Sequence, residues 1–156
     1  MLQRIQSIYL FLATITLFAL FIVPLVHDVM INGHADTVFV TGVYETAANG
    51  AQTHVQTFLA LEVSTFVVAL LPLVILFRFK NRAQQIALCY STMLVIIGFS
   101  FWVSQTVKSS IHDSDLTMSN YGIGIILLSV SLLFVVLAQK AIQRDEKLVK
   151  SADRLR

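Results

Sequence analysis

Four long apolar blocks constrain this 156-residue chain more than any other feature of its sequence. They cover residues 7–26, 57–77, 83–107 and 121–139, and the only charged side chain inside them is Glu62. A helix of about 20 residues crosses a hydrocarbon core of about 30 Å. Charged residues make up 13% of the chain, about half of the roughly 25% typical of soluble domains. The sequence therefore predicts an all-α membrane protein, a single integral membrane domain over residues 1–156 built as a bundle of four transmembrane helices.

The first block has an alternative interpretation, because a basic residue, Arg4, precedes it as in a signal peptide. The apolar region of a signal peptide usually has about 7–15 residues, whereas this block has about 20, and no small-x-small cleavage site follows it promptly. We therefore expect an uncleaved first span.

The basic residues indicate the orientation of these spans. Of eleven lysines and arginines, all except Lys108 lie before the first block, in the loop 78–82 or in the tail 140–156. Basic residues close to the ends of spans resist translocation and stay in the cytoplasm. We expect a multi-pass protein with both termini in the cytoplasm and with outer loops at 27–56 and 108–120.

The first outer loop carries a turn signal between two extended segments. Residues 37–45 are rich in β-forming side chains, Asn49-Gly50 follows them, and residues 52–56 are again extended in character. Asn-Gly favours a tight hairpin because both residues tolerate positive φ. The sequence predicts a short extracytoplasmic β-hairpin.

The carboxylate of Glu62 is a functional candidate because a charge inside a span is costly. It lies about 7 Å from the outer start of its span on helix rise, not at the midplane. Three roles remain open: structural hydrogen bonding, handling of an ion or substrate, and contact with a partner. The plausible donors in the third span are Ser100, Trp102, Ser104 and Gln105.

The tail 140–156 has the pattern of an amphipathic helix that continues the fourth span. Its basic arc could attract anionic lipid headgroups, worth about 1 kcal/mol per residue near the surface, or the whole helix could dock on a partner protein. Arg4 would lie at the same face of the membrane. The basic arc consists of Lys140, Arg144, Lys147, Lys150 and Arg154, and the apolar arc of Ala141, Ile142, Leu148, Val149, Ala152 and Leu155.

No motif in the sequence indicates a catalytic, cofactor or metal site. The four histidines fall in the outer loops without the spacing typical of metal ligands, and the single cysteine, Cys89, cannot form an internal disulfide. Nucleophile-elbow and phosphate-loop motifs are missing. We therefore expect no enzyme activity, no cofactor and no nucleic-acid partner. The hydroxyls of the second and third spans are expected to form hydrogen bonds between helices.

Three segments together resemble one family. They are the start (residues 1–10), Tyr121-Gly122-Ile123-Gly124 at the fourth span, and the end (residues 145–156), where the final Ser-Ala-Asp-Arg-Leu-Arg is the most specific part. The chain resembles the small four-span membrane proteins of Bacteroidota that form a domain of unknown function. The resemblance implies a location in the cell inner membrane of a Gram-negative bacterium and assigns no catalytic residue.

These observations favour a non-enzymatic accessory or scaffold subunit of a membrane complex. Its expected partners are the lipid bilayer, anionic lipid headgroups and other membrane or cytoplasmic proteins, with self-association as a further possibility. The alternative is a small transporter or channel component that uses the intramembrane carboxylate of Glu62.

Overall fold

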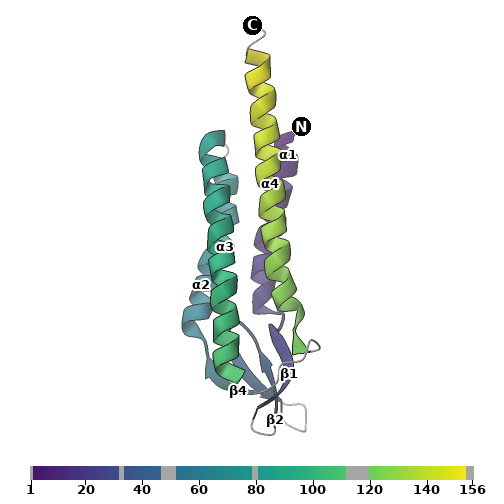
Figure 1. The fold of residues 1–156 in the computed structure, drawn as a ribbon, viewed down its shortest axis with the longest axis vertical. Coiled ribbons are helices and arrows are strands. Elements are labelled where there is room, and N and C mark those ends of the chain that lie inside the picture. Colours follow the sequence, from purple (N-terminus) through teal and green to yellow (C-terminus); the bar gives the residue numbers. More distant parts are fainter. Residues whose placement is uncertain (1, 32–33, 47–51, 79–80, 112–119, 154–156) are drawn as a thin grey trace.

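In the described residues, four helices and one small sheet make up the fold, which we describe from a computed structural model (Figure 1). The structure describes all residues except 1, 32–33, 47–51, 79–80, 112–119 and 154–156. The helices are α1 (Leu2–Phe18), α2 (Leu59–Phe77), α3 (Arg82–Ile111) and α4 (Ile123–Asp153), and a 3-10 turn, η1 (Ala19–Phe21), follows α1. The strands are β1 (Val26–Ile31), β2 (His34–Val38), β3 (Gly42–Thr46) and β4 (Gln52–Thr57).

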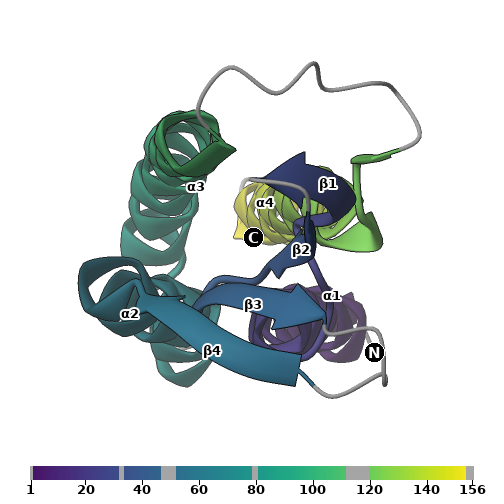
Figure 2. The ribbon, with the colours of Figure 1, turned by 90° about the horizontal axis from the view of Figure 1, so that it is seen from below.

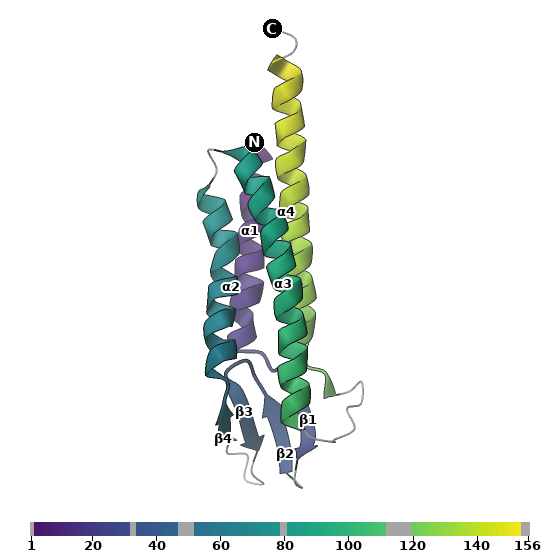
Figure 3. The ribbon, with the colours of Figure 1, turned by 60° about the vertical axis from the view of Figure 1, so that its left-hand side comes forward.

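The helices stand side by side, with the sheet across one end (Figures 1 and 3). Helix α1 packs on α2 and on α4, and α3 packs on the same two helices. Sequence neighbours in this arrangement are therefore also neighbours in space, and the first helix meets the last. We call the end that carries the strands the sheet end, and the opposite end, with Arg78, Arg82, Lys140 and Arg144, the basic end.

The helices bury one stripe each at helical spacing. On α1 the buried side chains include Leu10, Ala13 and Leu17, and on α4 they include Ala138 and Ile142. Apolar side chains also cover the outside of the helices, as expected where lipid replaces water around a protein. The outward-facing, largely exposed group includes Ile8, Phe11, Phe66, Leu94, Phe101, Ile126 and Leu133.

Among the described residues, three helices are long and apolar enough to cross a membrane by length and composition: Leu59–Phe77, Arg82–Ile111 and Ile123–Val149. The apolar part of α1 with η1, Ile5–Phe21, is shorter. The block expected at 7–26 is thus helical over a different range, because Pro24 follows the 3-10 turn and Val26 already begins a strand. The fold is that of a mostly helical protein whose apolar helices are compatible with a membrane location.

The strands form one antiparallel sheet in the order β1-β2-β3-β4. Its register pairs Met30 with Ala35, Val38 with Val43, and Glu45 with Thr53. The register shifts within β1, between Val26 and Val29, where Asp28 has a φ of 52°. Figure 2 shows the sheet from below, crossing under the helix ends from α4 towards α2.

The sheet is larger than the sequence predicts. Strands β3 and β4 correspond to the expected hairpin, whose Asn49-Gly50 turn lies outside the described residues. Strand β1 and most of β2 lie where the sequence predicts no strand. The segment expected as one strand over 37–45 is also divided, because the chain turns between Phe39 and Gly42, whose main-chain groups bond each other. A Cβ at Gly42 would collide with the Gln56 carbonyl oxygen, so only glycine fits at this turn.

The start of α4 is tied to the sheet end by main-chain contacts. The Gly122 amide donates to the Leu25 carbonyl at 2.8 Å, and the Gly124 amide donates to the Pro24 carbonyl at 3.0 Å. A Cβ on Gly122 would collide with the Pro24 carbonyl oxygen, and one on Gly124 would lie 2.8 Å from it. Both glycines are therefore required by close approach of the two chain segments.

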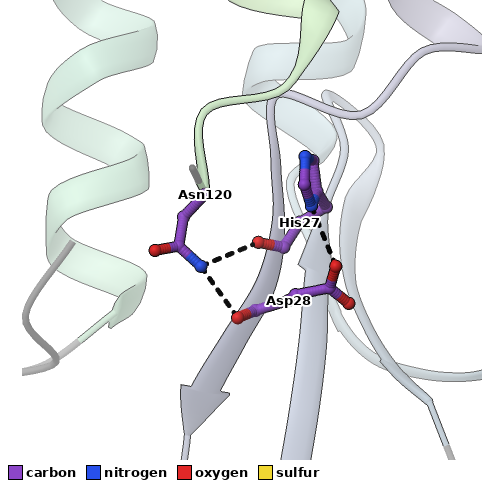
Figure 4. A network of polar contacts seen from close by, with 3 residues as sticks. All are labelled: His27, Asp28 and Asn120. Atoms are coloured by element: carbon purple, nitrogen blue, oxygen red, sulfur yellow. Dashed lines mark hydrogen bonds and ion pairs between the residues drawn. The ribbon is translucent and has the colours of Figure 1, made fainter. Parts of the chain in front are cut away.

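A side-chain amide completes this connection. The Asn120 Nδ2 group donates to the carbonyls of His27, at 3.2 Å, and Asp28, at 2.8 Å (Figure 4). The His27 ring nitrogen lies 3.0 Å from an oxygen of the Asp28 carboxylate. The polar loop side chains thus fix the distorted start of β1 against the segment that leads into α4.

Helix α4 continues without a break beyond the other helices at the basic end (Figures 1 and 3). Its 31 residues correspond to about 46 Å at about 1.5 Å per residue. The expectation that the tail continues the fourth helix is confirmed as far as Asp153.

Candidate functional site

Glu62 lies in the first turn of α2, at the sheet end. Its amide donates to the Phe58 carbonyl at 2.9 Å, and the Phe58 amide donates to the Thr41 carbonyl at 3.0 Å. No side chain caps the start of α2 at Phe58, and a carboxylate in the first turn interacts favourably with the positive end of the helix dipole. The position of Glu62 therefore has a sufficient structural explanation, and a functional role for it stays a prediction.

The serines expected to bond Glu62 lie elsewhere. Ser100 and Ser104 line a groove between α3 and α4, and the Ser100 hydroxyl donates to the Ile96 carbonyl at 2.7 Å. The expectation of hydroxyl bonds between helices is wrong for Ser64 and Thr65 as well, which donate to the Ala60 and Leu61 carbonyls. A hydroxyl that bonds a carbonyl of its own preceding turn is satisfied without a neighbouring helix.

A side-chain contact between α3 and α4 lies towards the basic end. The Gln139 Nε2 group donates to the Tyr90 hydroxyl at 2.9 Å, and the Gln143 Nε2 group reaches the same oxygen at 3.4 Å. Gln139 is buried, whereas half of Tyr90 is exposed. Two amides one helical turn apart on α4 therefore hold one phenol of α3.

Two further polar contacts lie close to the turn between α2 and α3. The Gln85 Nε2 group donates to the Ile75 carbonyl at 3.1 Å, which joins the start of α3 to the last turn of α2. The Arg82 guanidinium donates to the Asp145 carbonyl at 3.2 Å and so joins the start of α3 to α4. Asp145 itself is 7% exposed.

Lys140 and Arg144 line a groove between α1 and α4, with a volume of about 300 Å³. The α1 wall consists of Ile5 and Tyr9, and Leu137 and Ala141 complete the α4 wall. The structure therefore brings two of the basic residues that the sequence singles out together with the first turns of α1. The side chain of Arg4, next to Ile5 in α1, lies outside the described part of the chain.

The remaining basic candidates follow on the projecting end of α4. Lys147 is exposed, and the side chains of Lys150 and Arg154 lie outside the described residues. Leu148 and Val149 are 52% and 46% exposed. Because Arg82 reaches α4 at Asp145, the two turns after that residue extend past the start of α3. Within the described part of the chain, no neighbouring helix covers the apolar side chains there.

A second groove runs between α3 and α4 at the sheet end, with a volume of about 180 Å³. Its walls are mainly apolar with three serine hydroxyls, and Lys108 and Tyr121 also line it. The lining residues are Ser100, Val103, Ser104, Val107, Lys108, Tyr121, Ile125, Leu128 and Ser129.

Groups of three or more His, Cys, Asp or Glu side chains that could hold a metal ion do not occur among the described residues. His27 lies against Asp28, and His54 packs on Tyr44 with ring centroids 4.7 Å apart. The thiol of Cys89 is free and buried. His112 lies outside the described residues.

The sequence interpretation missed the buried polar residues of the basic end. It singled out neither Asp145 nor the two amides, Gln85 and Gln139. Helical periodicity could have found Asp145, since Val135, Ala138, Ile142 and Asp145 follow one buried stripe of α4. The partners of Gln85 and Gln139 depend on which helices pack together, which periodicity within one helix does not specify.

Comparison with known families gives one result that covers nearly the whole chain. The family described as a domain of unknown function, DUF4293, matches residues 2–155. No curated protein matches the chain.

Proposed function

We propose that this chain, which belongs to the DUF4293 family of domains of unknown function, is a non-enzymatic accessory or scaffold subunit of a membrane complex. The observation that carries the proposal is the projecting end of α4, where exposed apolar side chains extend beyond the rest of the fold. A helix that projects from a packed domain with uncovered apolar side chains is suited to bind a partner.

The proposal includes four spans in the cell inner membrane, with both termini in the cytoplasm. Its support is the length and apolar composition of α2, α3 and α4, the position of α1 beside α2 and α4, and the basic residues at the end where both termini lie. The α1–η1 segment Ile5–Phe21 has a length of about 26 Å, and a span somewhat shorter than the hydrocarbon core is accommodated by local thinning of the bilayer.

The projecting end of α4 is better suited to contact a protein partner than to pack against the rest of the fold. Leu148 and Val149 lie after Asp145, whose carbonyl accepts a hydrogen bond from Arg82. Lys147, beside them, is exposed as well. A partner that covers the two apolar side chains and places an acidic group near Lys147 would match both the shape and the charge of this segment.

Site-specific photo-crosslinking in intact cells tests the proposal directly. A photoreactive residue at position 148 should give a discrete adduct with one protein, identified by mass spectrometry. The matched control carries the same residue in place of Leu94 of α3, which is 71% exposed along an apolar span. We expect no discrete protein adduct there, because lipid should surround that position.

Two results would overturn the subunit proposal. One is the absence of any protein adduct at position 148 when the variant is present at the normal level. The other is an adduct that contains only two copies of this chain, which would indicate self-association. Reporter fusions after Asp153 and within residues 47–51 test the topology separately, since the first should report the cytoplasm and the second the outer side.

A further inference from the structure

The groove between α1 and α4 combines two cations with an apolar floor. Lys140 and Arg144 are both exposed and are one helical turn apart, so their charged groups lie on the same side of α4. Ala141 lies between them in sequence, and its small side chain leaves room in the groove. None of the six lining residues is acidic, so the positive charge of the groove is not neutralised by its own walls.

The same face of α4 continues as an exposed apolar stripe. At about 100° per residue, Ile126, Leu133, Leu137, Lys140 and Arg144 fall within an arc of about 60°. Ile126 is 60% exposed and Leu133 is 55% exposed, so the rest of the chain leaves much of this face uncovered. The face is therefore apolar over about 16 Å and basic at one end. This pattern suits an amphiphile with a negatively charged headgroup.

We propose that this groove binds an anionic glycerophospholipid. Its phosphate lies between the Lys140 ammonium and the Arg144 guanidinium, which form charge-assisted hydrogen bonds with phosphate oxygens. Its acyl chains follow Leu137 and Leu133 along α4. Tyr9 on the α1 wall lies beside the headgroup, and tyrosine is enriched at this depth, at the boundary between membrane and water.

The depth of the site agrees with this occupant. The uncharged part of α4, residues 123–139, measures about 26 Å along the helix axis, close to the hydrocarbon thickness of about 30 Å. Lys140 is the first charged residue after it and therefore lies where lipid phosphates lie when α4 crosses the membrane. A free phosphate ion would use the cations and leave the apolar stripe uncovered. A zwitterionic headgroup would bring its own ammonium close to two cations.

Lipid titration of the purified full-length chain tests the proposal. Native mass spectrometry from mild detergent should show phosphatidylglycerol bound more tightly than phosphatidylcholine. The double variant Lys140→Gln, Arg144→Gln should weaken phosphatidylglycerol binding about tenfold or more, because the phosphate loses its charge-assisted hydrogen bonds with both side chains.

The matched control, Arg78→Gln with Lys147→Gln, also removes two positive charges from the basic end but none from the groove. It should change phosphatidylglycerol binding less than twofold. Equal weakening in the two double variants would overturn the proposal, since it would indicate diffuse attraction to the whole basic end. Equal binding of the two lipids by the unmodified chain would overturn it too.

A second variant tests the groove without a change of charge. Ala141→Leu fills the space between the helices, and it should lower phosphatidylglycerol binding at least fivefold, while Ala141→Ser should keep it within twofold. The thermal unfolding of both variants should remain close to that of the unmodified chain, because Ala141 is only partly buried. Undiminished binding by Ala141→Leu, or displacement of the lipid by excess inorganic phosphate, would contradict a lipid site.

Discussion

The two ends of the molecule are connected in different ways. At the sheet end, main-chain groups meet main-chain groups, as where the amides of Gly122 and Gly124 donate to the carbonyls of Leu25 and Pro24. At the basic end, side chains reach between helices, as where Gln139 holds the hydroxyl of Tyr90. At the sheet end, segments that are far apart in sequence thus bond each other directly through their main chains. At the basic end, side chains bridge the distance between the helices.

The two ends therefore have different effects on α4: the sheet end fixes its position, and the basic end exposes its side chains. Main-chain contacts need close approach and leave little freedom of position, so the sheet end sets where α4 begins. At the basic end, α4 continues past its neighbours, and Lys140, Arg144 and Leu148 are exposed. We expect substitutions at the sheet end to affect folding and substitutions at the exposed basic end to affect binding.

The largest effect should follow from Gly122→Val. The added side chain would collide with the Pro24 carbonyl oxygen, and relief of such overpacking costs about 1–3 kcal/mol or more. Thermal unfolding in detergent should show a large decrease in Tm. Gly98→Ala is the matched control, because a Cβ on Gly98 meets nothing within 4 Å and alanine is favoured over glycine in a helix by about 1 kcal/mol. Equal stability of the two variants would mean that the close approach at Gly122 does not hold α4.

The second-largest effect on stability is expected at Gln85, whose side-chain amide is buried at the basic end. Gln85→Leu removes the donor to the Ile75 carbonyl and should lower stability by about 1 kcal/mol. The loss stays modest because the Gln85 Oε1 atom is buried without a hydrogen-bond partner among the described residues, and the variant relieves that cost. Gln84→Leu, at an exposed neighbouring position, should leave the Tm almost unchanged. A Gln85→Leu variant more stable than the unmodified chain would show that the amide costs more than its bond contributes.

The features that the sequence predicts correctly are those that depend on residues close together in the chain. Apolar block length is a local property, so it located α2, α3 and α4, and the periodicity of the tail predicted its continuation as a helix. The expected turn at Asn49-Gly50 likewise depends on two adjacent residues. The second hairpin signal, Asn32-Gly33 between β1 and β2 in the sequence, was equally local and was overlooked.

What escaped prediction depends on contacts between distant segments. Gly122 and Gly124 contributed to the family resemblance, yet their requirement becomes visible only once the Pro24 carbonyl lies against them. The groove at Lys140 and Arg144 needs the first turns of α1 as its second wall. Neither contact can be recognised from the periodicity of side chains within one helix.

A smaller effect is expected at the contact between α3 and α4. Tyr90→Phe removes the hydroxyl that Gln139 and Gln143 share. Hydrogen bonds between membrane helices contribute about 0.6 kcal/mol on average, so the Tm should fall by no more than a few degrees. Tyr121→Phe, at an exposed side chain of the sheet end, is the control and should have no measurable effect. Equal Tm values for both variants would show that the Tyr90 hydrogen bonds do not help to hold α3 against α4.

The smallest effect on stability should come from Glu62→Gln, and it decides between two functions. The carboxylate lies in the first turn of α2, where its interaction with the helix dipole contributes about 0.3 kcal/mol once salt screens it. As a structural residue at the sheet end, it should leave the crosslink at position 148 and growth unchanged. Loss of proton-linked uptake in cells that carry Glu62→Gln, with the protein present at its normal level, would instead favour the transporter alternative. Glu62→Asp, which keeps the charge in the same turn, should then restore part of that uptake, whereas a purely structural carboxylate predicts no difference in uptake among the three proteins.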